Sequence, residues 1–256
     1  MGSTSANGID TAISGAAAQE MNFPHVVSGS GGGGVYASEI AVYNMSSTDQ
    51  TIRFTFTPEA GAGSVSVTKP LPANGGIFAV ADELFSFRTF QNGWVRVTGS
   101  DRITGLVAYA TAGGQGEGGG AAMVPRQTTP SSNLFFAHIA DLPPWYTGIA
   151  LLNTSSTNAE VEVYAMNPDG TLIAGAANVP TAKFTLNAGT KVAKLLSELL
   201  PQTQKRTSDG GFVFVRTTNN VPLYGIELFF SRNLLVFINV AASTLPQGIT
   251  YTPPAP

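Results

Sequence analysis

The sequence contains no cysteine and only two histidines, and charged residues make up only 11% of its 256 residues. Without cysteine there is no disulfide, no thiolate metal ligand and no cysteine nucleophile. The formal net charge of -3 leaves no basic excess to neutralise phosphates, which argues against nucleic-acid binding. An average domain has roughly 25% charged residues. Ser, Thr, Asn, Gln and Gly must therefore cover much of the surface, a composition common in exported β proteins.

Long apolar runs are also missing. The most apolar stretch, residues 225–240, is interrupted by Glu227, Ser231, Arg232 and Asn233 and cannot supply the roughly 18 to 20 apolar residues of a membrane span. Residues 1–21 lack the basic start and the apolar run of a signal peptide, and Met1-Gly2-Ser3 is typical of an expression start. We expect a chain without a membrane span, and we expect any native export signal to be absent from this sequence.

Short segments with alternating polar and apolar residues are present along the chain. Such patterns, rich in β-branched and aromatic residues, are typical of half-buried strands. Examples are residues 51–57, 64–68, 94–98 and 160–164, separated by turn-forming residues at 44–48, 92–93, 153–158, 167–170 and 209–211. Strands spaced by about ten residues without long helical patterns predict antiparallel sandwiches rather than a parallel α/β sheet.

The second half of the sequence matches the first in six ordered blocks. The blocks pair 23–26 with 136–139, 36–48 with 146–157, 58–61 with 167–170, 71–84 with 186–199, 93–97 with 211–215, and 104–107 with 224–227. Such self-similarity indicates two copies of one domain. We expect a flexible N-terminal segment at residues 1–21, β-sandwich repeats at 22–127 and 128–245, and a Pro-rich tail at 246–256.

One short helical candidate lies in each copy. The first is residues 80–85 and the second is residues 191–200, which Pro201 stops. The predicted fold class is all-β, with two tandem antiparallel β-sandwich (Ig-like) domains that each contain one short helical turn.

The order of these features resembles an Ig-like repeat that occurs in tandem in secreted or surface proteins of bacteria. The features are Phe-Pro-His at 23–25, a Gly-rich loop at 29–34, a strand ending in Asn44, Leu-Pro-Ala-Asn-Gly at 71–75, Glu-Leu at 83–84 and Gly-Trp at 93–94. The resemblance covers about residues 22–243. It implies a fold and an exported protein, and it carries no catalytic or ligand residue over to this chain. The second copy departs from the pattern at residues 141–145, where it lacks the Gly-rich loop.

Neither histidine has the neighbours that a reactive or metal-bound histidine requires. His25 and His138 occupy equivalent places in separate copies, which argues against a shared zinc site with three or four ligands. A hydrogen-bonded side chain at the edge of the sandwich is the favoured interpretation, because no spacing indicates a serine and a carboxylate beside either histidine. No loop concentrates three carboxylates as a calcium loop does, although one opportunistic ion stays open. We predict no catalytic residue, no cofactor and no metal.

Two glycine-rich stretches, residues 29–34 and 114–119, formally match a dinucleotide-binding pattern. That chemistry needs a helix that begins directly after the loop. A strand pattern follows the first stretch and Pro125 follows the second, so we interpret both as flexible hairpin loops.

Three further polar positions leave alternatives open. Asn44 and Asn153 are formal N-glycosylation acceptors at equivalent positions, and a turn in which Asn and Ser cap backbone groups is the favoured interpretation. Glu227 interrupts the apolar residues 223–230. It indicates either the outer face of an edge strand, which we favour, or a charge that opposes strand pairing.

Two neighbouring aromatic residues, Trp145 and Tyr146, are the candidate contact residues. They follow Pro143-Pro144 and are predicted to lie in a loop, where an exposed aromatic platform can stack on a sugar ring or a partner protein. Tyr146 also aligns with Tyr36, which leaves a packing role open. Trp94 aligns with Phe212 and is predicted to be core.

The sequence favours a non-catalytic structural or interaction protein, a surface spacer, adhesion or assembly unit outside the cell. Edge strands and the apolar residues 234–238 provide a means of association by strand addition. Self-association or another surface protein is the expected partner. The alternative is a carbohydrate-binding module that binds a polysaccharide through Trp145 and Tyr146.

Overall fold

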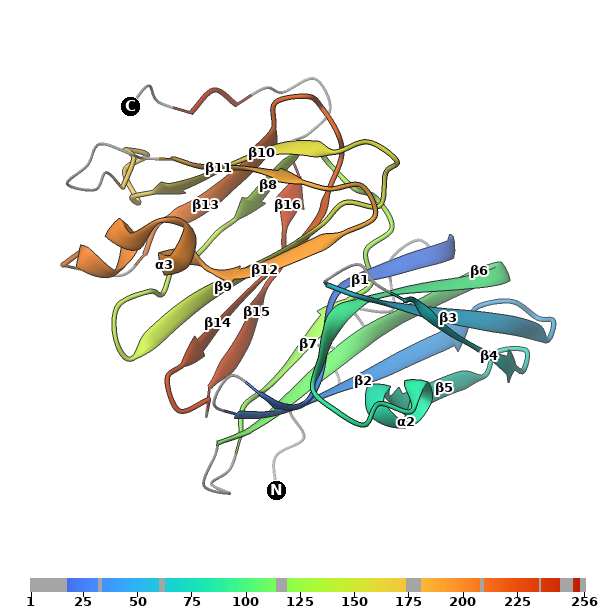
Figure 1. The fold of residues 1–256 in the computed structure, drawn as a ribbon. Helices are drawn as coiled ribbons and strands as arrows, with labels where there is room; N and C mark the ends of the chain where they lie inside the picture. Colours follow the sequence, from blue (N-terminus) through green and yellow to red (C-terminus); the bar gives the residue numbers. More distant parts are fainter. Residues whose placement is uncertain are drawn as a thin grey trace. The chain divides into compact units, whose positions relative to one another are not determined.

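The computed structural model describes residues 18–31, 34–59, 63–113, 119–173, 181–207, 210–234, 236–244 and 251–253. Antiparallel strands dominate this part of the chain (Figure 1). The helical elements described are short: α2 (Ala81–Phe85), α3 (Leu196–Leu199) and the 3-10 helix η1 (Pro201–Lys205). The predicted all-β class with antiparallel sheets is confirmed.

The chain divides into two compact units between Thr128 and Thr129, with the short segment Gly119-Gly120 grouped with the second unit. In the first unit the strand order is β4-β3-β6-β1-β2-β5, and β7 also pairs with β6. The strands are β1 (Ala18–Gly31), β2 (Gly34–Asn44), β3 (Gln50–Pro58), β4 (Val65–Leu71), β5 (Gly76–Val80), β6 (Gln91–Gly113) and β7 (Ala121–Pro125). The first part of β6 pairs with β3 and β1, and its last part pairs with β2 and β7.

The second unit contains two separate sheets. One has the order β11-β10-β13-β8-β16 and the other has the order β12-β9-β14-β15. Their strands are β8 (Asn133–Phe136), β9 (Trp145–Leu152), β10 (Ala159–Met166), β11 (Thr181–Leu186), β12 (Lys191–Leu195), β13 (Phe212–Thr217), β14 (Tyr224–Ser231), β15 (Phe237–Val240) and β16 (Ser243–Thr244). Inward side chains of both sheets form one apolar core that includes Phe136, Ile149, Val163 and Val215. Alternate side chains of a strand point to the same face, so one face of each sheet supplies this core.

The strand pairings of the second unit correspond to those of the first. Ile40 pairs with Val107 in the first unit, and Ile149 pairs with Glu227 in the second. Phe54 likewise pairs with Val97, and Val163 pairs with Val215. The two units therefore share one arrangement of neighbouring strands, in which β13 and β14 together take the place of β6.

Three predicted boundaries differ from the structure. Strand β1 begins at Ala18 and Met21 is fully buried, so the described chain is ordered before residue 22. Residues 191–195 of the predicted second helix are the strand β12, because pairing with β9 outweighs a local helical preference. Tyr251, in the predicted tail, packs against two aromatic rings of the second unit. Residues 1–17 lie outside the described part of the chain.

Candidate functional site

Trp145 and Tyr146 begin strand β9, so the prediction that they lie in a loop is wrong. Both side chains are half-buried. The Trp145 ring lies 6.3 Å from the Phe229 ring, and the Tyr146 ring lies 5.9 Å from the Phe230 ring. Successive residues of a strand point to opposite faces. The two aromatic side chains therefore do not form one platform.

An open hollow lies where the chain enters β9, and Trp145 is not among the residues that line it. It is lined by Pro144, Ser231, Arg232, Asn233 and Val236. Trp145 is paired with Ser231 across the sheet, and Arg232 donates its backbone N–H to the Pro144 carbonyl at 2.7 Å. The hollow thus joins the start of β9 to the turn between β14 and β15, with hydroxyl, amide and guanidinium groups on its lining.

Buried polar groups lie at the start of β9 and in the chain before it. Asp141 is fully buried and its carboxylate accepts the backbone N–H of Thr147 at 3.2 Å and the hydroxyl of Thr203. The Thr147 hydroxyl accepts the N–H of Ala140 and donates to the carbonyl of Ala140, both at 3.0 Å. These bonds tie the chain before β9 to the start of that strand.

Glu227 is also fully buried in this region. It lies on β14 between β9 and β15, so the favoured prediction of an outer face on an edge strand is wrong. It faces inward because it pairs with Ile149, whose side chain is part of the core. Neither carboxyl oxygen has a hydrogen-bond partner among the described residues. Burial, followed by the negative charge of Asp141, raises the pKa of Glu227 well above its ordinary value.

The first unit has the same framework without the carboxyl group. Val107 stands where the second unit has Glu227. The Ser38 hydroxyl accepts the N–H of Val27 at 3.0 Å and donates to its carbonyl at 2.7 Å, as Thr147 does with Ala140. The hydroxyl bridge is therefore a structural feature of both units, whereas the buried glutamate belongs to the second.

The two histidines contact aromatic rings at corresponding places. His25 lies 5.9 Å from Tyr109, which donates its hydroxyl to the His25 carbonyl, and His138 lies 4.9 Å from Phe229. Burial raises the pKa of Tyr109. Within the described residues, no group of three or more His, Cys, Asp or Glu side chains is placed to hold a metal ion.

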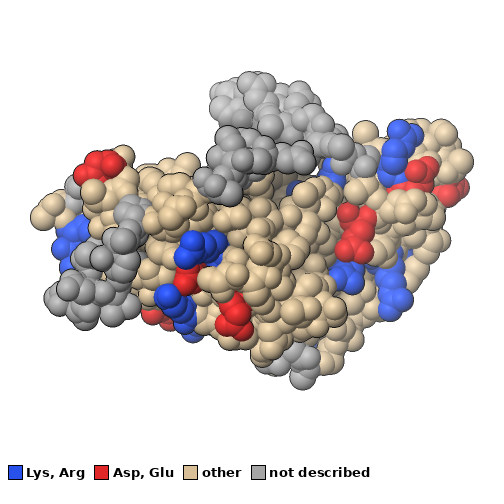
Figure 2. Space-filling model, turned by 90° about the horizontal axis from the view of Figure 1, so that it is seen from above, with Lys and Arg blue, Asp and Glu red and all other residues tan. Residues whose placement is uncertain are grey.

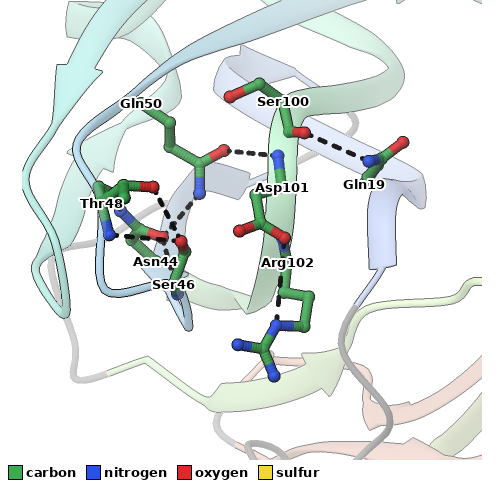
Figure 3. Close-up of polar contacts among 8 residues, drawn as sticks. All are labelled: Gln19, Asn44, Ser46, Thr48, Gln50, Ser100, Asp101 and Arg102. Atoms are coloured by element: carbon green, nitrogen blue, oxygen red, sulfur yellow. Dashed lines mark hydrogen bonds and ion pairs between the residues drawn. The ribbon is translucent and has the colours of Figure 1, made fainter.

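Asn44 and Asn153 are buried at the centre of corresponding turns, where the side-chain nitrogen is engaged. Figure 3 shows the first turn, in which the Asn44 side chain receives the N–H of Ser46 and the side-chain amide of Gln50. The Asn44 amide donates to the carbonyls of Thr48 and Pro72 at 2.8 and 2.9 Å. Asn153 does the same with the carbonyls of Thr157 and Leu186. This geometry supports the turn interpretation over glycosylation.

The glycine-rich stretches are followed by strands in the described chain. Residues 29–31 end β1, and β2 begins at Gly34. Residues 114–118 of the second stretch lie outside the described residues, and Ala121 begins β7. Neither described continuation provides the helix that phosphate binding requires.

Among the described residues, four of the seven exposed large apolar side chains lie on strands at sheet edges. Val65 on β4, Phe78 on β5, Met123 on β7 and Ile238 on β15 are each at least 41% exposed. Strand β5 pairs only with β2 among the described strands, and its sequence Gly-Ile-Phe-Ala-Val has no charged residue and no proline. Phe78 is 60% exposed and packs edge-on against Tyr43 at 5.3 Å.

The apolar residues 234–238 are less accessible than the sequence indicates. Leu234 and Phe237 are buried, and only Ile238 is strongly exposed at 43%. Gly120 donates its N–H to the Leu234 carbonyl, so the turn before β15 already has a hydrogen-bond partner. The side chain of Leu235 lies outside the described part of the chain.

Charged residues form small separate groups on the face drawn in Figure 2. That distribution shows no broad basic area on the visible surface, as expected from the low charge of the sequence. None of the described helices has the length and apolar character that crossing a membrane requires.

Comparison with known proteins adds little to this geometry. No protein-family model matches the sequence, and no curated protein matches it. A solved structure described as "Crystal Structure of Thermotoga maritima 1070" matches with 14% sequence identity and a TM-score of 0.38 over 44% of this chain and 96% of that chain. A likeness at this level transfers neither fold nor function to the chain.

Proposed function

We propose that the protein is a non-catalytic structural or interaction protein outside the cell, which associates with other copies or with other surface proteins by strand addition. The first unit's strand β5 is the surface that supports this proposal best. An exposed sheet edge presents unpaired backbone N–H and C=O groups that can pair with a further strand.

A comparison between the two units carries the proposal. The edge strand β12 of the second unit corresponds to β5 and carries two lysines, of which Lys191 is buried and Lys194 is exposed. Lysine on an edge strand opposes pairing with another chain. Strand β5 has Gly76 and Ala79 at the corresponding positions, together with the exposed ring of Phe78. The first unit therefore lacks the protection that the second unit has.

The extracellular location rests on composition and on the resemblance to exported bacterial repeats. A surface covered by small polar residues with few charges, and a chain without cysteine, suit an exported bacterial β protein. We treat two tandem Ig-like copies as part of the same proposal, and the corresponding strand pairings of the two units support it.

Light scattering over a concentration series, with negative-stain images of the most concentrated sample, tests the proposal. We expect discrete oligomers or ordered assemblies for the unaltered protein. Ala79→Lys places on β5 the residue type that β12 carries. The protein concentration at which oligomers form should rise at least tenfold in this variant. Thr68→Lys on β4 is the control, because that edge already carries Lys69 and Pro70. A protein that stays monomeric at all concentrations and has no partner contradicts the proposal.

Polysaccharide binding is the second candidate, and the hollow at the start of β9 favours it. The lining residues Ser231, Arg232 and Asn233 offer hydrogen-bonding groups, and Trp145, which pairs with Ser231 across the sheet, offers a stacking face. Affinity electrophoresis on a panel of polysaccharides tests it. Trp145→Ala should abolish retention, whereas Tyr146→Ala should leave it unchanged because Tyr146 points to the other face of β9.

A further inference from the structure

The outer face of one sheet in the second unit is aromatic. Val213 and Val215 of β13 point into the core, so their neighbours Phe212 and Phe214 point away from it. Phe214 pairs with Phe135 of β8 on one side and with Tyr164 of β10 on the other. The Phe214 ring lies 4.5 Å from Phe135 and 5.9 Å from Tyr164. Below, the surface formed by Phe135, Tyr164, Phe212 and Phe214 is called the aromatic face.

The corresponding face of the first unit is polar at three of the four positions, and at the fourth Trp94 stands where the second unit has Phe212. There, Arg96 of β6 pairs with Asn22 of β1 and with Thr55 of β3. Asn22, Arg96 and Thr55 thus stand where the second unit has Phe135, Phe214 and Tyr164. A strand of a two-layered domain ordinarily places polar residues on its outer face. The aromatic face departs from that pattern, and large exposed apolar surfaces usually mark an interaction site.

A segment from the C-terminal end of the chain covers the aromatic face. The Tyr251 ring lies edge-on to Phe214 at 4.8 Å and to Phe135 at 5.2 Å, with interplanar angles of 78° and 76°. Edge-to-face contacts of this kind are favourable. Phe214 is fully buried, Pro253 is buried, and burial raises the pKa of Tyr251. The aromatic face and Tyr251 form one apolar cluster with Met166 and Leu172.

The carboxylate of Glu162, beside this face, finds all its partners on the same sheet. The Glu162 carboxylate accepts the Tyr164 hydroxyl at 2.6 Å and contacts Lys183 at 2.8 Å and Arg216 at 2.7 Å. Arg216 also lies over the Tyr164 ring at 5.5 Å. These contacts fix the Tyr164 ring without help from the covering segment. The aromatic face is therefore held in place by its own sheet.

We propose that the aromatic face is a binding surface for an extended Tyr-Thr-Pro segment, which is occupied by residues 251–253 of the same molecule and, in assemblies, by those residues of a second copy. The sequence from Tyr251 is Tyr-Thr-Pro-Pro-Ala-Pro. Proline restricts this segment to extended conformations, which lowers the entropy lost on binding, and Pro-rich segments commonly dock on aromatic-lined surfaces.

The length of the connection favours the contact within one molecule when copies are dilute. Six residues, 245–250, join β16 to Tyr251. A short connection gives an effective concentration on the order of mM for the contact within one molecule. Exchange of an identical segment between copies needs no new contact and is a low-cost route to association. It becomes favourable only where copies are concentrated, as in an assembly, and in that respect the inference rests on the proposed function.

A labelled peptide with the sequence of residues 249–256 tests the surface. Fluorescence anisotropy should show at least tenfold tighter binding to the Tyr251→Ala variant than to the unaltered protein, because the variant leaves the aromatic face open. A peptide with alanine in place of tyrosine should bind at least tenfold more weakly. Equal binding of both peptides, or no binding to Tyr251→Ala, overturns the proposal.

A mixing experiment tests the exchange between copies. Phe135→Asn introduces the residue of the first unit and should release the segment, while Tyr251→Ala leaves the face open. Both variants carry Ala79→Lys as well, so that they do not assemble through β5. Sedimentation of an equimolar mixture, above the dissociation constant of the peptide, should then show a one-to-one complex that neither variant forms alone. A mixture that contains no complex overturns exchange between copies. Near-ultraviolet circular dichroism checks that Phe135→Asn is folded, and the peptide measurement does not depend on that variant.

These measurements separate the inference from the proposed function. The peptide measurement is also made with the Ala79→Lys variant, which alters β5 and leaves the aromatic face unchanged. Peptide binding that persists in a protein that never assembles contradicts strand addition through β5 but not the binding surface. Assembly that depends on β5, without any peptide binding, contradicts the binding surface but not strand addition through β5.

Discussion

Glu227 in the second unit occupies the position of Val107 in the first. Each pairs with an inward-facing isoleucine, Ile149 and Ile40 respectively, and each is fully buried. One fold therefore contains the same site twice, once with an apolar side chain and once with a carboxyl group that has no hydrogen-bond partner among the described residues. The pair allows the energetic effect of that carboxyl group to be measured within one protein.

We expect Glu227→Val to stabilise the second unit. A buried polar group without a partner costs about 1 to 3 kcal/mol, and valine is the residue that the first unit accommodates here. Urea unfolding should show an increase of that size in the free energy of unfolding. The two tryptophans lie in different units, so Trp94→Phe leaves Trp145 as the reporter of the second unit. The reverse change, Val107→Glu, should destabilise the first unit, and a loss of stability in Glu227→Val would contradict this account.

The stability of the second unit should also depend on pH through Glu227. Its pKa in the folded protein is raised above the ordinary value of 4.5, so the folded state holds the proton more tightly than the unfolded state. Its effect on stability is therefore most favourable below about pH 4.5 and becomes unfavourable as pH rises toward the folded pKa.

Urea midpoints of the unaltered protein and of Glu227→Val, measured from pH 4 to pH 8, test this dependence. The advantage of the variant should be smallest at pH 4 and should grow with pH. An advantage that is the same throughout the range means that Glu227 does not titrate between the folded and unfolded states as proposed.

The sequence predicts which segments are strands better than it predicts where each strand begins. Alternation in residues 51–57 and 160–164 correctly indicates β3 and β10, because period 2 reports which residues face the core. Lys191–Leu195 has no clear alternation, so its pairing with β9 decides its conformation. Trp145 follows two prolines that indicate a loop, yet the strand begins directly after them.

Glu227 could not be placed from sequence because a charge within an apolar run has two meanings. On an edge strand it points to solvent, and on a central strand it is buried. The pairing of β15 with β14 makes β14 a central strand, and local sequence patterns do not predict that pairing. The alignment of Glu227 with Val107 was the one available signal, since Val107 is apolar at the same place. The aromatic face was missed for a related reason, because Phe212 and Phe214 lie in a strand that is apolar on both faces.

The buried turns at Asn44 and Asn153 should be intolerant of aspartate. Asn44→Asp and Asn153→Asp retain an acceptor but lose the N–H groups that bind the carbonyls of Pro72 and Leu186. Each change places a carboxylate against carbonyl oxygens and should cost more than about 1 kcal/mol in the unit that contains it. Asn158→Asp is the control, because its side-chain oxygen only accepts the Ala188 N–H at an exposed site. Equal tolerance of all three changes, in urea unfolding, would contradict the turn interpretation.

Glu162 should give the second unit a pH dependence opposite to that of Glu227. Burial alone would raise its pKa, but hydrogen bonds from Lys183, Tyr164 and Arg216 lower the pKa to about 2, below the ordinary 4.5. Its stabilising effect is therefore complete above pH 4.5 and is lost as pH falls toward 2. Glu162→Gln should reduce the free energy of unfolding by about 1.5 to 3 kcal/mol at pH 7, the usual worth of hydrogen bonds to a charged group, and by much less at pH 2.5. Glu160→Gln on the same strand, where the side chain is exposed and bonds Thr185, should change stability by no more than about 0.5 kcal/mol at either pH. A Glu162→Gln effect of equal size at both pH values would show that the contacts of this carboxylate do not depend on its charge.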